Sequence, residues 1–369
     1  MDHTQPGRVV GIQSIRESLL ADKSERPTVV GTGLITLDIV LGGDCGQSGQ
    51  LYAGGTCGNV LTILSFLGWE SYPVARLNGD TASRKVLQDL KNWGVNTRFA
   101  RLKPEANTPI IVHQIQHDIT GYPRHTFKWI CPQCGAFLPG YKAVTIAAAK
   151  QVIGDVHQVK AFFMDRASPG AIYMAKAFAE NGALIVFEPS GAKDERLFKE
   201  AIGIADILKY SEERARSFYD LLNSSVKPPL VVETRGDKGL RYLKSSCDRR
   251  NLRWREIEPF SVSKIKDAAG AGDWCTAGII HMLGRNGREG FRQVSDAIIQ
   301  ASLNLGQAMA AWACRFEGAR GGMYLTDKEV FHSTIIRTIQ SVSPEIPVNR
   351  SQSLGVKSLR RSTPICPSC

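Results

Sequence analysis

The sequence lacks any hydrophobic run of the roughly 18 residues that a membrane-spanning helix requires. Residues 1–23 carry charges throughout and contain no apolar core, so they do not have the pattern of a secretory signal peptide. Hydrophobic residues make up 43% of the 369 residues and charged residues 22%, which is typical of an ordinary globular protein of one large domain or two. We therefore expect a cytoplasmic protein with no membrane partner.

Acidic residues are fewer than basic ones, 35 against 46, and the net charge is +11. Such an excess suits nucleic acid, but it equally suits a polyanionic small substrate such as a nucleotide. Residues 349–361 contain no acid and carry a group of basic side chains, Arg350, Lys357, Arg360 and Arg361. This stretch is either a solvated tail or a binding arm.

Nine cysteines in a chain without an export signal indicate a reducing compartment, where thiols are buried, catalytic or metal-bound. Two Cys-Pro-x-Cys motifs, at 131–134 and 366–369, predict the halves of one tetrahedral zinc site. The predicted ligands are Cys131, Cys134, Cys366 and Cys369. Reactive thiols on an untethered tail, or a disulfide formed on oxidation, are the alternatives. The other cysteines are expected to be single thiols, namely Cys45, Cys57, Cys247, Cys275 and Cys314.

Apolar β-branched runs alternate with helix-compatible segments along most of the chain. Residues 27–43 look like a buried strand, 59–69 like a helix packed on a sheet, and 71–80 like a further strand and turn. The strand-like 159–168 and 183–190 flank a helix-like segment. This alternation predicts an α/β fold with a doubly wound, mainly parallel sheet and helices on both faces.

Residues 267–278, DAAGAGDWCTAG, combine three glycines, four alanines and two aspartates before a helix-compatible segment. A glycine turn that leads into a helix presents unpaired N–H groups at the positive end of the helix dipole, where an anion can approach closely. A carboxylate at that place, Asp273, makes sense if a hydroxyl loses its proton while a phosphoryl group arrives. The alternative is a tight turn or a close contact between helices.

This stretch resembles the second signature of the ribokinase-like (PfkB) sugar kinase family, Asp-Thr-x-Gly-Ala-Gly-Asp-x-Phe. Ala268 and Cys275 replace the usual Thr and Phe, and five positions match: Asp267, Gly270, Ala271, Gly272 and Asp273. The resemblance implies that Asp273 is the catalytic base. It also implies that the N–H groups of Ala271, Gly272 and Asp273 form an anion hole for the transferred phosphoryl group.

Residues 53–68 resemble the first signature of the same family, with the glycine pair Gly54 and Gly55 and with Asn59 four residues later. In the family the glycines admit a polyol close to the backbone and the Asn holds a hydroxyl. Asp38 lies where the family has a carboxylate that binds sugar hydroxyls. The resemblance therefore implies that Asp38, Gly54, Gly55 and Asn59 bind the acceptor, whereas Asp38 or Asn59 alone suggests only a turn or cap residue.

Three further segments resemble the nucleotide side of the family: 208–214, 234–239 and 316–322. The first fits poorly, because Ser211 and Arg214 replace the Asn and Glu that manage magnesium and phosphate. Glu212 and Glu213 are either substitute magnesium ligands or exposed acids at a helix start. The remaining residues implied to bind nucleotide are Lys209, Ser211, Thr234, Gly236, Gly239, Asp267 and Gly318.

The resemblance covers roughly residues 27–330 and implies a kinase domain at 27–342 with a small β lid. The lid would come from 40–52 and 107–142, the latter carrying the insertion at 131–134. Residues 1–26 would be an N-terminal extension and 343–369 a basic C-terminal tail. Aromatic residues of the lid, Tyr122, Phe127 and Trp129, either stack on a ligand or pack within the protein.

We therefore expect an ATP- and Mg²⁺-dependent kinase that phosphorylates a hydroxyl of a sugar or nucleoside, and the sequence does not choose between these acceptors. A homodimer formed through the lid is a further expectation. A kinase-fold protein that binds such ligands but regulates is the main alternative, supported by Ala268 and the altered 208–214 segment. A nucleic-acid-binding protein is a third class, not expected because a pure binder needs no base such as Asp273.

Overall fold

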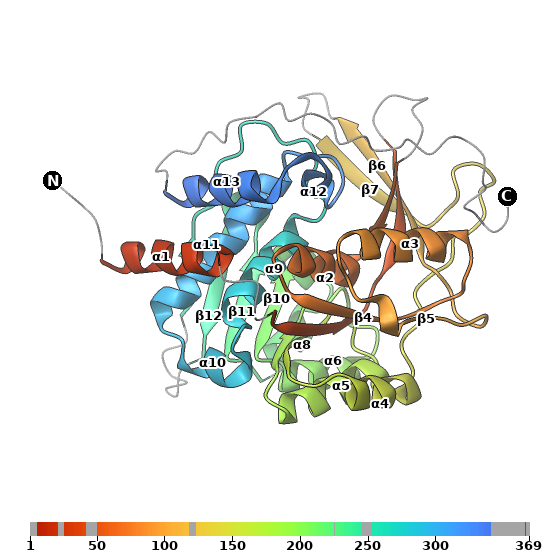
Figure 1. Ribbon diagram of the computed structural model, residues 1–369, viewed down its shortest axis with the longest axis horizontal. Helices are drawn as coiled ribbons and strands as arrows, with labels where there is room; N and C mark the ends of the chain where they lie inside the picture. The colour runs from red at the N-terminus through yellow and green to blue at the C-terminus, as the bar shows by residue number, and fades with distance from the viewer. Residues whose placement is uncertain are drawn as a thin grey trace.

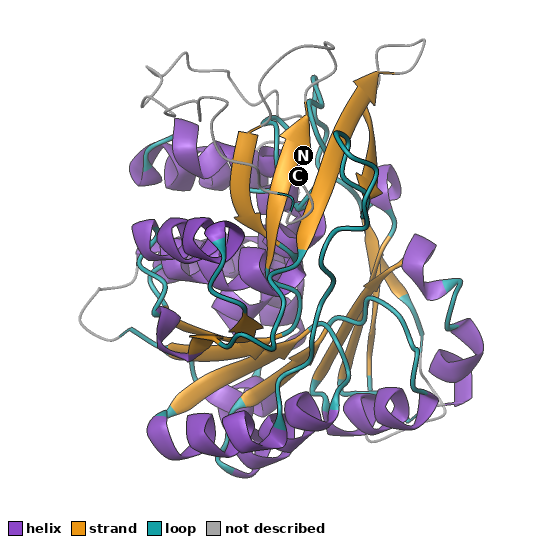
Figure 2. Cartoon of the chain, turned by 90° about the vertical axis from the view of Figure 1, so that its right-hand side faces the viewer, coloured by secondary structure: helices purple, strands orange, loops and turns teal. Residues whose placement is uncertain are grey.

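The computed structural model describes residues 6–20, 26–41, 50–117, 123–224, 226–245, 253–340 and Cys366. They form one sheet of nine strands, a second sheet of four strands, and helices around both (Figure 2). Within these described ranges, no helix combines the length and the apolar character needed to cross a bilayer.

The large sheet has the strand order β13-β12-β11-β10-β9-β8-β1-β4-β5. Its neighbours pair in parallel except at one edge, where the pairs β11–β12 and β12–β13 are antiparallel. The strands are Thr28–Thr32 (β1), Glu70–Leu77 (β4), Ala100–Leu102 (β5), Val159–Met164 (β8), Leu184–Phe187 (β9), Ile207–Ser211 (β10), Leu230–Thr234 (β11), Leu240–Lys244 (β12) and Arg255–Ile257 (β13). The prediction of a mainly parallel α/β sheet is confirmed.

Two hydrophobic cores, one on each face of the large sheet, follow from the alternation of side chains along its strands. Val29 and Phe163 belong to one core, while their chain neighbours Val30 and Phe162 belong to the other. Figure 1 shows helices on both faces. The first core is covered by Pro6–Leu20 (α1), Thr56–Phe66 (α2), Thr81–Asn92 (α3), Ala271–Leu283 (α9), Gly287–Gln293 (α10), Asp296–Ala313 (α11), Gly321–Leu325 (α12) and Lys328–Gln340 (α13). The second core is covered by Ile146–Asp155 (α4), Pro169–Glu180 (α5), Glu195–Ile204 (α6), Glu212–Ala215 (α7) and Tyr219–Ser224 (α8).

The small sheet has the order β3-β2-β6-β7 and stands apart from the large one (Figure 2). Its strands are Thr36–Leu41 (β2), Gln50–Gly54 (β3), Ile110–His117 (β6) and Pro123–Lys128 (β7). The two middle strands, β2 and β6, pair in parallel, and the outer pairs are antiparallel. The segments expected to form a lid thus contribute most of this sheet.

The segment 27–43, expected to be one buried strand, divides between the two sheets instead. The chain leaves β1 at Gly33, whose φ of +149° is a conformation that L side chains rarely adopt, and enters β2 at Thr36. The buried carboxylate of Asp165 fixes this turn, because it accepts hydrogen bonds from the N–H groups of Leu34 (3.0 Å) and Cys57 (3.1 Å). A glycine inside an apolar run was the signal for the break.

Helix α1, in the segment expected to be an N-terminal extension, packs on α11 and α13. Its Ile15 and Leu19 are buried in the first core. The ring Nε2 of His281 lies 2.9 Å from the carbonyl oxygen of Ser18. The described part of the N-terminal segment is therefore an integral part of the packing.

Candidate active site

The glycine bend at 270–272 forms the start of α9. Gly270 has a left-handed φ of +77°, and a Cβ there would lie 2.5 Å from the Cβ of Ala319, so only glycine fits. The bend therefore depends on glycine for both its conformation and its close contact with the 316–322 turn. The N–H of Ala271 donates to the carbonyl of Ala268 over 3.3 Å, while Gly272 and Asp273 present first-turn N–H groups that have no partner within the helix.

Asp273 is buried in the first turn of α9. The side-chain amide of Asn59, from the first turn of α2, donates to its Oδ2 over 2.7 Å. Burial raises the pKa of Asp273 to about 7 and the negative charge of Glu188 adds to the rise, while the Asn59 hydrogen bond opposes it. A carboxyl group with this pKa accepts a proton readily at neutral pH.

A buried ion pair lies beside the bend. Lys209 of β10 and Glu188, just after β9, approach to 2.8 Å and are both almost fully buried. The hydroxyl of Thr276 in α9 donates to the second oxygen of Glu188 over 2.5 Å. A Cβ on Gly272 would lie 3.6 Å from the Lys209 ammonium, so this cation borders the anion hole that the sequence predicted.

The four residues implied to bind the acceptor surround the junction of β2, β3 and α2. Gly54 leaves room for Asp38, because a Cβ there would lie 1.9 Å from a carboxylate oxygen of Asp38 and would displace that side chain. Gly55 has a φ of +79° and precedes α2, which carries Asn59. Asp38 accepts a hydrogen bond from the Thr36 hydroxyl, and burial raises its pKa to about 6.

Arg320 is one of the residues of this site that the sequence analysis did not identify. Its side chain is buried, and its Nε donates to Oδ1 of Asn59 over 3.1 Å. Its other end binds the carbonyl of Ala53 and, at 2.6 Å, the carboxylate of Asp89 in α3. Asn59 is thereby held between Arg320 and Asp273, which fixes the direction of its amide.

Neither Arg320 nor Asp89 has a signal in the sequence that marks it. Arg320 follows Gly318 in the predicted nucleotide turn. Because the chain contains many basic residues, nothing in the sequence distinguishes this arginine from the others. Asp89 looks like any helix-surface acid. Asp165 did have a signal, since it follows a buried parallel strand, where ligand-binding side chains of α/β sheets gather.

The Asp267 carboxylate links the glycine bend at 270–272 to the turn at 316–322 and does not project as an isolated ligand. One carboxylate oxygen accepts the N–H of Ala269 and the other the N–H of Gly318, both over 2.9 Å. His113, on β6 of the small sheet, lies 3.8 Å from the same carboxylate. The small sheet and the bend are therefore in contact through Asp267.

The remaining nucleotide-side residues lie at the ends of β10 and β11. Thr234 ends β11, and Gly236 and Gly239, both with positive φ, form the following turn. Ser211 caps α7 by accepting the N–H of Arg214 over 3.2 Å. Glu212 and Glu213 are exposed in the first turn of α7, the position of helix-start acids.

Three of the four predicted zinc ligands come together, and Cys369 lies outside the described residues. The sulfur atoms of Cys131, Cys134 and Cys366 all lie within 4.8 Å of one another. Of the lid aromatics, Phe127 stacks on His113 with 4.9 Å between ring centroids, Trp129 is partly exposed, and Tyr122 lies outside the described residues.

The site as a whole can accept a proton at a buried carboxyl group and bind an anion beside it. The model of the pfkB family carbohydrate kinases matches residues 43–324. No curated protein matches the sequence significantly.

Solved structures of similar fold include an uncharacterized sugar kinase from Pyrococcus horikoshii, with a TM-score of 0.61 at 19% identity over 85% of this chain and 100% of that one. Aminoimidazole riboside kinase from Salmonella enterica, complexed with aminoimidazole riboside and an ATP analog, has a TM-score of 0.62 at 18% identity over 84% and 99%. Arabidopsis thaliana ribokinase, complexed with ribose and ATP, has a TM-score of 0.60 at 17% identity over 86% and 100%. At these identities the structures show the shared ribokinase-like fold. Since the family model spans most of the sequence, the chain belongs to the pfkB family of carbohydrate kinases.

Proposed function

We propose that the protein transfers the γ-phosphoryl group of ATP to a hydroxyl of a sugar or nucleoside, with Asp273 as general base. The observation that carries this proposal is a buried carboxyl group with a pKa of about 7 in the first turn of a helix that begins with a glycine bend. Solved structures of the same fold include kinases with ribose or aminoimidazole riboside bound.

Each group has a defined task in this reaction. Asp273 takes the proton of the acceptor hydroxyl, whose oxygen forms a bond to the γ-phosphorus as the bond to ADP breaks. The N–H groups at the start of α9, with the Lys209 ammonium beside them, stabilise the charge on the transferred group. Asp38 and the backbone around Gly55 bind other hydroxyls of the acceptor, and Asn59 orients Asp273.

Magnesium fits this site as a partner of the ATP phosphates. Mg²⁺ usually keeps several waters and takes only one or two carboxylates in addition to phosphate oxygens. Glu212 and Glu213 are exposed and can supply such oxygens, whereas both oxygens of Glu188 already have partners. When bound, the ion neutralises phosphate charge.

The runner-up is a sugar- or nucleotide-binding regulator with weakened catalysis. Arg214 favours it, because a cation stands where the family has a Glu, and this cation lowers the pKa of Asp273. A location in the cytoplasm and a dimer formed through the lid remain predictions of the same account.

The test is ATP consumption with a panel of sugars and nucleosides, with mass spectrometry of the products. The proposal expects ADP to form together with a phosphorylated acceptor. Saturable acceptor binding with no ATP turnover at any pH between 6 and 9 would favour the regulator instead.

A further inference from the structure

The loop that carries Cys131 and Cys134 is a tight hairpin beyond the end of β7. The N–H of Cys131 donates to Ala136 over 2.8 Å, and the N–H of Gly135 donates back to Cys131 over 3.0 Å. Gly135 makes the reversal with a φ of +73°. The hairpin thus places both thiols on one side of a short turn.

This hairpin is already arranged to hold a thiolate. The N–H of Gln133 points at the sulfur of Cys131 over 3.4 Å. An N–H donor stabilises a sulfur atom that carries negative charge and so favours the deprotonated ligand. Cys131 is buried, whereas Cys134 is exposed on the hairpin.

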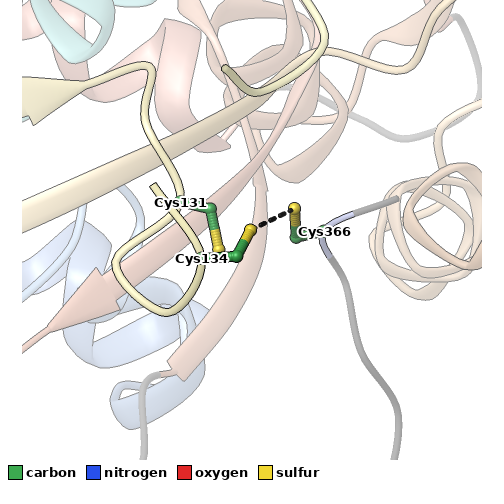
Figure 3. A group of neighbouring side chains, drawn as sticks. All are labelled: Cys131, Cys134 and Cys366. Atoms are coloured by element: carbon green, nitrogen blue, oxygen red, sulfur yellow. Dashed lines mark hydrogen bonds between the residues drawn. The ribbon is translucent and has the colours of Figure 1, made fainter. Parts of the chain in front are cut away.

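Cys366 approaches this hairpin from a segment more than two hundred residues away (Figure 3). Its sulfur lies 3.7 Å from that of Cys134, and the side chain of Cys366 is buried. Zinc–sulfur bonds of about 2.3 Å place the corners of a tetrahedral site about 3.8 Å apart. The observed spacing matches that edge and is far longer than a disulfide bond, which measures about 2.05 Å.

We propose that Cys131, Cys134, Cys366 and Cys369 bind one structural zinc ion that fastens the C-terminal segment to the lid. Thiolates are soft ligands that select zinc or iron–sulfur clusters over magnesium or calcium. Cys369 follows Cys366 with the same Cys-Pro-x-Cys spacing as the pair in the hairpin and is proposed as the fourth ligand on that spacing alone, since it lies outside the described residues. A closed set of four thiolates leaves no position for substrate, so the role is structural.

The hairpin connects this zinc site to the strands of the lid. Its far end reaches β6, because the N–H of Ile110 donates to the carbonyl of Pro139 over 3.1 Å. The N–H of Leu37, on β2, donates to the neighbouring Pro109 over 2.9 Å. Asp38 follows Leu37 directly, so the zinc ion supports the strand that carries a proposed acceptor ligand.

The experiment measures zinc in the full-length protein purified in reducing buffer without chelator. We expect one zinc per chain, and its loss on Cys366→Ser or Cys369→Ser. Cys314→Ser is the matched control, since that thiol lies outside the cluster, and it should keep the zinc. Replacing zinc with cobalt in the unmutated protein should give the intense visible absorption and sulfur-to-metal charge transfer of a tetrahedral thiolate site.

A second measurement does not depend on variants that fold poorly. Removing zinc from the unmutated protein with a chelator should speed amide hydrogen exchange at Cys131 and Gly135 and leave the α9 amides protected. Zinc-free protein from zinc-supplemented cultures, bound iron in place of zinc, or a Cys134–Cys366 disulfide seen by mass spectrometry would each overturn the proposal. Zinc retained in both tail variants would overturn it too. None of these results depends on kinase activity, so the zinc site and the proposed function can fail separately.

Discussion

The acceptor side and the nucleotide side of the candidate site are built in different ways. On the acceptor side, hydrogen bonds link the buried Asp273, Asn59 and Arg320 to the half-buried Asp89 and so join α9, α2 and α3. On the nucleotide side, glycine turns and exposed acids such as Glu212 lie at the ends of β10 and β11. Under the proposed function, this difference means that the protein itself positions the Asp273 carboxyl group, whereas ATP and magnesium would complete the contacts on the nucleotide side.

The largest expected effect is on turnover, from Asp273→Asn. The Asn side chain keeps the size and one oxygen but cannot accept the proton, so kcat should fall about 1,000-fold, or about 4 kcal/mol in the barrier. Steady-state ADP release measures it, with circular dichroism to check the fold. Near-normal turnover in this variant would remove Asp273 from the role of base.

The next effect is on stability, from Arg320→Met. Removing the buried Arg320 guanidinium leaves the half-buried Asp89 carboxylate with only its hydrogen bonds from Ala53 and Tyr324. The loss should be about 3 kcal/mol, the lower end of the range for breaking a buried ion pair. The matched control is Arg255→Met, whose pair with Asp296 is exposed and is worth about 1 kcal/mol or less. Urea unfolding of both variants measures the difference. Equal losses would show that the acceptor side is not specially cross-linked.

Asp38→Ala should weaken acceptor binding and spare ATP. Deleting a partner of buried hydroxyls costs about 1–3 kcal/mol, which corresponds to roughly 10- to 100-fold in the acceptor KM. The KM for ATP serves as the internal control. If both KM values rise together, the acceptor map is wrong or the fold is disturbed.

Some residues of the candidate site could be identified from the sequence and others could not. The bend at Gly270 and the pair Gly54–Gly55 were found because glycine at a left-handed turn or at a close contact is visible in the local sequence. The Asn59–Asp273 contact joins residues 214 positions apart and could be inferred only from the family resemblance. Arg320 and Asp89 could not be found, because which surface-like charges become buried partners depends on how α3 packs against the 316–322 turn.

The elements predicted best are those that have a clear local pattern of apolar residues. Parallel strands such as β8 and β9 are short apolar runs between helices, and this pattern alone predicts them. The split of 27–43 between two sheets was missed, since both halves are apolar and only Gly33 marks the turn. The zinc prediction depended on a repeated motif, and the structure brings three of its cysteines together.

The pH dependence of kcat/KM should also distinguish the acceptor side of the site from the nucleotide side. As a base, Asp273 must be deprotonated, so kcat/KM should rise as pH increases through about 7 and level off above it. A magnesium- or nucleotide-limited reaction would show no such step. Profiles measured at saturating Mg²⁺ and ATP, with a poor acceptor to keep chemistry slow, provide the comparison.

The raised pKa of Asp273 also affects stability, which should fall over the pH range in which kcat/KM rises. The folded state keeps a proton on Asp273 that the unfolded chain loses near pH 3.8, so the shift costs stability progressively as pH rises from about 4 to 7. Asp273→Asn removes this cost. Its melting temperature relative to wild type should therefore increase over that pH range, and a constant difference would contradict the shift.

The smallest effect is expected from Glu212→Gln with Glu213→Gln. Because both acids are exposed and magnesium is held mainly by phosphates, the double variant should need severalfold more Mg²⁺ for half-maximal rate while kcat stays similar. Titration of activity with Mg²⁺ measures it. An unchanged magnesium requirement, with a stability loss below about 1 kcal/mol, would assign the two acids to the helix dipole alone.

The most direct test of the central claim is a ¹³C NMR titration of the Asp273 side-chain carboxyl carbon, assigned by its disappearance in Asp273→Asn. The claim is that the fold holds this carboxyl group ready to accept a proton at neutral pH. We predict a titration midpoint near pH 7. A midpoint near 3.8, the value of an ordinary aspartate, would contradict the account.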